Sequence, residues 1–180
     1  MAGFALARFW KANIMNSMAK LFLSPSGRIP RRPFIIAVAV FIVFVMAQKY
    51  LFVYMDNGLP KFFLQFGLFF LNLHIIMAVY GKRLHDLGRS FWPLIGLFAL
   101  MAIVFLVLIL NFGGIEYFDT VMANPEYAGN EEAMQKVLQT YQDKLAKGLP
   151  TANWIMAGLP ALFTLWLALA PGQADKNRYG

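Results

Sequence analysis

A polar segment, YGKRLHDLGRSFWP at residues 80–93, interrupts a chain that is otherwise strongly apolar. It gathers side chains that often do chemistry in proteins: Lys82, Arg83, His85, Asp86 and Arg89. A histidine beside a carboxylate could act as general acid and base, and clustered arginines could bind an anion. The third interpretation is structural, with the segment as the polar turn between two membrane-spanning helices.

The spacing of these residues disfavours catalysis. His85 and Asp86 are adjacent, and adjacent helical residues point about 100° apart, so they are poorly placed to form a dyad with one another. His74 precedes His85 by roughly 16 Å along a helix, so the two histidines cannot share a metal ion. The chain has no cysteine, which excludes thiolate sites. We therefore expect no catalytic, cofactor-binding or metal-binding residue and no enzymatic activity.

Composition indicates the elements that must position this segment. The chain has 180 residues, of which 59% are hydrophobic and 14% charged, whereas a soluble domain has about a quarter charged residues. About 20 apolar residues cross a bilayer as a helix. Four such runs predict an all-α membrane protein with transmembrane helices at about 34–55, 62–80, 91–112 and 154–170.

Residues 1–26 predict an amphipathic helix before a membrane domain that covers 27–180. Apolar residues recur at helical spacing from Ala7 through Trp10 and Ile14 to Leu21. We expect this helix to lie in the membrane interface. Packing on another subunit is the alternative.

The distribution of charge predicts the orientation of the spans. Eleven basic and two acidic residues fall on the side that holds both termini, against five basic and seven acidic residues on the other side. Positive charge is retained on the cytoplasmic side. We therefore expect both termini to be cytoplasmic. Because the topology explains the net positive charge of the chain, no nucleic-acid partner is required.

The connection at 113–150 is too long for a simple loop. Its first part has turn formers and no clear period, whereas a helix is predicted from a cap at Asn130 to a stop at Gly148 and Pro150. The apolar stripe of this outer helix comprises Met134, Val137, Leu138, Tyr141 and Leu145. The stripe could pack on the outer leaflet, on its own spans or on a partner protein.

Three polar residues fall inside the second span: Gln65, Asn72 and His74. No Asp or Glu falls inside any span, although proton- or cation-coupled carriers generally need such groups at depth. We expect His74 to donate an interhelical hydrogen bond rather than to relay protons.

The polar segment itself fits the end of a helix. Cations suit a helix C-terminus, Asp86 can pair with Lys82 or Arg83, and Gly88 is well placed as the residue that ends the helix. Three segments, GRIPRRPF at 27–34, RLHDLGRSFW at 83–92 and PGQADKNRYG at 171–180, together resemble the signature of the domain of unknown function 805 family. The resemblance covers the chain from about Gly27 onward. It implies a bacterial inner membrane protein of the YhaH type and leaves the activity open.

In the predicted topology these three segments meet at the cytoplasmic side. The side chains that could converge there are Arg28, Arg31, Arg32, Arg83, His85, Asp86, Arg89, Asn177, Arg178 and Tyr179. Such a cluster can lock loops together through hydrogen-bonded ion pairs. It can also bind an anionic lipid head.

The function that we expect is association: an accessory, assembly or membrane-organising subunit of the bacterial inner membrane. Its expected partners are the bilayer, an anionic lipid, and a protein partner or further copies of the chain. A small oligomeric channel or carrier is the alternative function, and a lipid-modifying enzyme is the third.

Overall fold

The computed structural model describes residues 19–173 and residue 179, and these form helices and no strand. Residues 19–23 are helical, while the rest of the predicted N-terminal helix, residues 1–18, lies outside the described residues. The elements that follow are α2 (Arg31–Val53), α3 (Leu59–Asp86), α4 (Trp92–Ile109), the π-helical η1 (Leu110–Gly114), α5 (Ile115–Ala123), the 3-10 helix η2 (Pro125–Gly129) and α6 (Glu131–Leu169).

Four of the helical segments are long and apolar enough to cross a membrane: Arg31–Val53, Leu59–Asp86, Trp92–Ala123 and Glu131–Leu169. Large apolar side chains along them are exposed at the protein surface, as at Val43 and Phe63. In a bilayer this surface faces lipid, where an exposed apolar side chain carries no cost. The chain is a multi-pass, all-α membrane protein, which confirms the predicted fold class.

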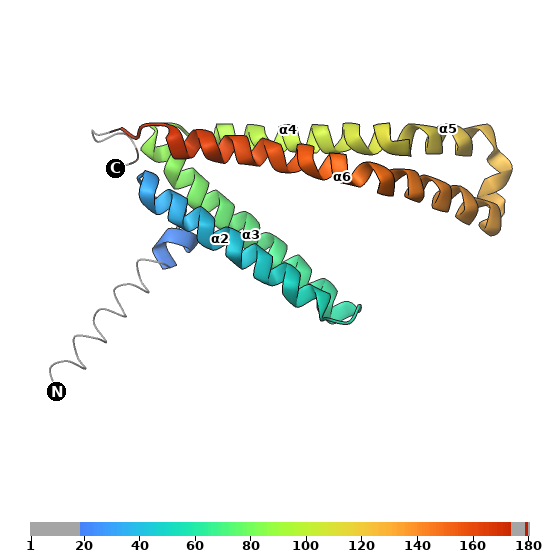
Figure 1. The fold of residues 1–180 in the computed structure, drawn as a ribbon, viewed down its shortest axis with the longest axis horizontal. Helices are drawn as coiled ribbons and strands as arrows, with labels where there is room; N and C mark the ends of the chain where they lie inside the picture. The colour runs from blue at the N-terminus through green and yellow to red at the C-terminus, as the bar shows by residue number, and fades with distance from the viewer. Residues whose placement is uncertain (1–18, 174–178, 180) are drawn as a thin grey trace. The chain divides into compact units, whose positions relative to one another are not determined.

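The chain divides into two compact units, one holding the residues up to Leu94 and from Trp166 onward, the other holding 95–165. In the first unit α2 and α3 run side by side (Figure 1). The buried apolar side chains of the described residues all belong to this unit: Ile29, Phe34, Ala37, Ile75, Ala78, Val79, Leu84, Leu94 and Leu167.

These buried residues gather where α2 begins and where α3 and α6 end. The ring of Phe34, in the first turn of α2, packs edge-on against that of Tyr80, near the end of α3, with centroids 5.4 Å apart. Every residue from Gly81 to Asp86 is buried. We call this region the basic end, because its polar members are mostly cationic. It is the part of the first unit where protein rather than lipid surrounds the side chains.

The second unit is a helical hairpin in which α4, η1 and α5 form one arm and α6 the other (Figure 1). Because α6 has 39 residues, it is roughly 58 Å long, about twice the thickness of the hydrocarbon core. We call residues 115–150, which hold α5, η2 and the first half of α6, the acidic hairpin.

Two expectations about this hairpin were wrong. The outer helix does not stop at Gly148 and Pro150 but continues to Leu169. Gly148 is a packing residue, since a side chain there would collide with the ring of Phe112. The stretch after Gly113, expected to lack regular structure, forms α5 and η2. The predicted cap is confirmed, because the side-chain oxygen of Asn130 accepts a hydrogen bond from the backbone N–H of Ala133.

Candidate functional site

The basic end is organised by the way α3 terminates. Gly88 has φ +69°, a left-handed conformation that glycine adopts freely. Its N–H donates to the carbonyl of His85, and the N–H of Arg89 donates to that of Leu84 at 2.8 Å. This pair of bonds is a Schellman motif, so Gly88 is the residue after the helix cap, as predicted.

Arg83 lies at the centre of the basic end and is fully buried. Its Nε donates to the carbonyl of Leu167 at 2.9 Å, and one Nη donates to the carbonyl of Ala170 at 2.7 Å. The other Nη forms an ion pair with Asp86 and a longer hydrogen bond, 3.4 Å, to the carbonyl of Ile29. A single guanidinium therefore joins the end of α3, the end of α6 and the segment before α2.

Asp86 holds the segment that follows α6. Its backbone carbonyl accepts a hydrogen bond from the N–H of Gln173 at 2.8 Å. Its carboxylate lies against Gly172, where any side chain would meet that carboxylate. The predicted pair with Arg83 is present, and Lys82 has other partners.

His85 fills the opposite side of the turn. Its Nδ1 donates to the carbonyl of Gly27 at 3.2 Å, its ring stacks on that of Tyr179 at 3.9 Å, and Phe91 packs edge-on against it at 4.8 Å. The imidazole thus contacts residues of three distant segments of the chain, at 27–34, 83–92 and 171–180. The ion pairs of the described residues do not include one between His85 and Asp86, which a catalytic dyad would need.

Lys82 is buried without a carboxylate partner in the described part of the chain. Its ammonium group donates to the carbonyls of Lys20 and Leu21, in the short helix at 19–23. The carbonyls at a helix C-terminus lack helical partners and carry partial negative charge, which suits a cation. Sequence reasoning missed these acceptors, because no sequence signal marks a backbone carbonyl as the partner of a distant lysine.

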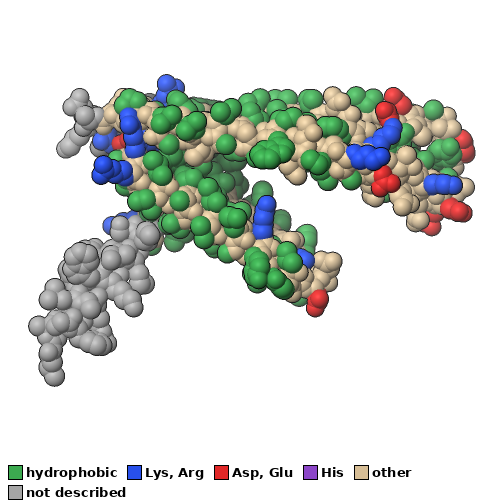
Figure 2. Space-filling view, in the orientation of Figure 1, with side chains coloured by type: hydrophobic (Ala, Val, Ile, Leu, Met, Phe, Trp, Pro, Cys, Tyr) green, Lys and Arg blue, Asp and Glu red, His purple; other side chains and the backbone are tan. Residues whose placement is uncertain are grey.

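Three of the remaining predicted cations, Arg31, Arg32 and Arg89, are exposed around this buried cluster. Arg31 and Arg32 begin α2, and the Nε of Arg31 donates to the carbonyl of Ala170 at 3.0 Å. The guanidinium of Arg89 lies over the ring of Trp166, 5.3 Å from its centroid. Figure 2 shows Lys and Arg side chains gathered here. Arg28 is half-buried, and Asn177 and Arg178 lie outside the described residues.

Two of the predicted intramembrane polar residues, Asn72 and His74, form hydrogen bonds to the protein's own groups. The side-chain amides of Gln48 and Asn72 exchange two hydrogen bonds, of 3.1 and 2.9 Å, between α2 and α3. His74 donates to the carbonyl of Leu23 at 2.7 Å, so its partner belongs to the segment before α2 rather than to another span. Gln65 is exposed. The sequence did not predict Gln48 as the partner of Asn72, because in the sequence Gln48 is only a polar residue that interrupts the first apolar run.

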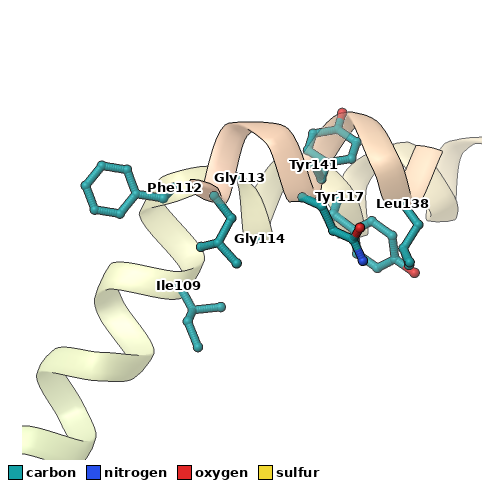
Figure 3. Close-up of a pocket in the computed structure, with 9 residues that line it drawn as sticks. Ile109, Phe112, Gly113, Gly114, Tyr117, Leu138 and Tyr141 are labelled. Carbon is teal, nitrogen blue, oxygen red and sulfur yellow. The ribbon is translucent and has the colours of Figure 1, made fainter. Parts of the chain in front are cut away.

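In the second unit, the apolar stripe predicted on the outer helix faces α5. Tyr141 packs edge-on against Tyr117 and shares a 2.8 Å hydrogen bond with Thr120, while the hydroxyl of Tyr117 contacts the sulfur of Met134. A mostly apolar pocket of about 260 Å³ lies where the two arms meet (Figure 3). The residues that line this pocket include three members of the predicted stripe, Leu138, Tyr141 and Leu145. The stripe is thus largely covered by the chain itself.

The opposite face of α5 is apolar and uncovered. Ile115, Phe118 and Met122, at positions i, i+3 and i+7, are 55%, 54% and 77% exposed. Sequence reasoning missed this face, because α5 carries apolar residues on two sides and so has no single period.

Comparison with known proteins places the chain in a family without a recorded activity. The family described as Protein of unknown function (DUF805) matches residues 22–180. No curated protein and no solved structure gives a significant match. The matched region contains the whole basic end, including the three segments that meet at Arg83 and His85. This chain therefore belongs to the DUF805 family of membrane proteins of unknown function.

Proposed function

We propose that this chain is an accessory or assembly subunit of the bacterial inner membrane, which acts by binding a partner protein through the exposed apolar face of α5. The observation that carries the proposal is the exposed apolar face of α5, formed by Ile115, Phe118 and Met122. The chain does not need α5 to cross the bilayer core. The 18 residues of α4 already cross roughly 27 Å, close to the thickness of the hydrocarbon core.

Charged residues on α5 keep this stripe out of the hydrocarbon. Glu116 and Asp119 lie between its members in sequence, and Glu116 forms an ion pair with Lys144 of α6. A contiguous apolar face outside the lipid core is typical of a protein interaction site. The rest of α5 packs on α6, so the stripe is free to be the contact surface.

The charge of the acidic hairpin favours a partner of a different kind over a second copy. Residues 115–150 contain six carboxylates and three lysines, and Figure 2 shows acidic side chains around the connection between α5 and α6. Two copies would bring like charges together, which costs free energy. An apolar helix flanked by basic residues would complement the surface.

The polar residues of the spans support association over transport. Gln48 and Asn72 satisfy each other's amides, and His74 is bonded to a backbone carbonyl. No observation favours a channel, a carrier or a lipid-modifying enzyme.

Photocrosslinking in native membranes tests the proposal. With p-benzoylphenylalanine in place of Phe118, we expect one discrete protein adduct on irradiation. Adding Met122→Glu should abolish that adduct, because a charge would be buried without a partner. The matched control is Gln135→Glu, an equal charge change at an exposed position of α6, and it should leave the adduct intact.

Three results would contradict the proposal. Adducts to lipid alone would mean that α5 lies on the outer leaflet. An adduct that survives Met122→Glu would place the contact elsewhere. An adduct between two copies of the chain would instead make the protein a homo-oligomer and overturn the charge argument.

A further inference from the structure

The cationic cluster at the basic end divides into two parts with different environments. Arg83, His85 and Asp86 are buried and hydrogen-bonded to backbone groups or to each other. By contrast, Arg31, Arg32 and Arg89 are exposed. We call these three the arginine rim.

The arginine rim lacks a carboxylate partner within the described part of the chain. Among the described residues of this end, the carboxylate is that of Asp86, and it pairs with Arg83. The ion pairs of the described residues include none of the three rim arginines. The exposed rim therefore carries positive charge that no carboxylate of the described residues balances by an ion pair.

Two of these guanidiniums contact the last turn of α6 and the residue that follows the helix. Arg31 donates to the carbonyl of Ala170, and Arg89 lies over the ring of Trp166. Trp166 and Ala170 are joined by a hydrogen bond from the backbone N–H of Ala170 to the carbonyl of Trp166. Both guanidiniums are therefore held at the same end of α6.

Aromatic residues indicate the depth of the rim in the membrane. Trp92, which begins α4, is 72% exposed, and Trp166 lies beneath Arg89. Tryptophan is enriched at the level of the lipid headgroups. The arginine rim is therefore at the depth where phospholipid phosphates lie.

We propose that the arginine rim binds the phosphate of an anionic phospholipid headgroup. The planar guanidinium donates two parallel hydrogen bonds to phosphate oxygens, which a lysine ammonium cannot do. The hydrogen bond from Arg31 to Ala170 and the contact of Arg89 with Trp166 hold these side chains in place before the lipid arrives. The inference does not depend on the proposed function, because it rests on residues of the first unit, whereas α5 belongs to the second.

Lipid selectivity measured on the reconstituted full chain tests the site. Spin-labelled phosphatidylglycerol and phosphatidylcholine are compared by the motionally restricted fraction in phosphatidylcholine bilayers. Each basic residue near a charged surface contributes on the order of a fivefold preference for the anionic lipid. Arg31→Gln/Arg32→Gln/Arg89→Gln should therefore lower the selectivity several-fold.

The matched control removes the same charge elsewhere. Lys49→Gln/Lys61→Gln/Lys136→Gln also replaces three cations by glutamine and should keep the wild-type selectivity. Since Arg31 also contacts the backbone, Arg32→Gln/Arg89→Gln is the second variant, and it should lose most of the selectivity with an unchanged helical spectrum.

Three results would overturn the site. One is wild-type selectivity in the rim variants, and another is an equal loss in the lysine control. The third is displacement of the labelled lipid by millimolar inorganic phosphate. That result would mean that the rim binds free phosphate from solution rather than a lipid headgroup.

Discussion

Removal of the Arg83 side chain is the sharpest test of what holds the basic end together. In Arg83→Met the volume is nearly kept, while the ion pair with Asp86 and the hydrogen bonds to Leu167 and Ala170 are lost. Breaking a buried pair by removing one partner costs about 3–5 kcal/mol, because the other charge stays buried and unpaired.

The exposure of Asp86 and the hydrogen bonds of Arg83 indicate how large the loss of stability should be. The side chain of Asp86 is 10% exposed, so water reaches it slightly and the ion-pair cost falls near 3 kcal/mol. The two short hydrogen bonds to carbonyls contribute about 1 kcal/mol each. Since the three losses share one side chain and are not additive, we expect the free energy of unfolding to fall by roughly 4 kcal/mol.

Unfolding in mixed micelles, followed by far-ultraviolet circular dichroism during titration with dodecyl sulfate, measures this change. Arg32→Met removes an exposed arginine from the same end and should change stability by less than about 0.5 kcal/mol. Arg83→Met/Asp86→Leu should be more stable than Arg83→Met alone, because no unpaired charge remains. A loss below about 1 kcal/mol for Arg83→Met would refute the reasoning.

Two further predictions concern the spans and their orientation. Asn72→Ala should destabilise the protein by about 1 kcal/mol in the same assay, since Gln48 loses its reciprocal amide bonds; an unchanged stability would mean that the pair contributes nothing. Because the chain has no cysteine, Ser26→Cys should react with an impermeant thiol reagent only from the cytoplasm and Glu126→Cys only from outside, and the reverse pattern would refute the orientation derived from charge.

The sequence predicted the features of this fold that depend on composition. The four spans follow from long apolar runs, and the end of α3 at Gly88 follows from a glycine after a cationic last turn. The meeting of the segments at 27–34 and 83–92 followed from topology and from the family resemblance. Their contacts through Arg83 and His85 now give that meeting a physical basis.

The parts that could not be predicted depend on contacts between distant residues. Glycine is a residue type that often ends a helix, but Gly148 lies against the ring of Phe112, where any larger residue would collide with that ring. Packing between the two arms thus decides that α6 continues. Likewise, the acceptors of Lys82 and Arg83 are mostly backbone carbonyls, which every residue carries and which only the folded chain selects.

The acceptors of Arg83 have a consequence for biosynthesis. Arg83 and Ala170 are separated by 87 positions, so at translation rates of about 5–20 residues per second they emerge roughly 4–17 s apart. During that interval α2 and α3 are already made, yet the guanidinium lacks two of its acceptors. A nascent or truncated chain that stops short of Leu167 therefore leaves the Arg83 guanidinium without the two carbonyl acceptors at the end of α6.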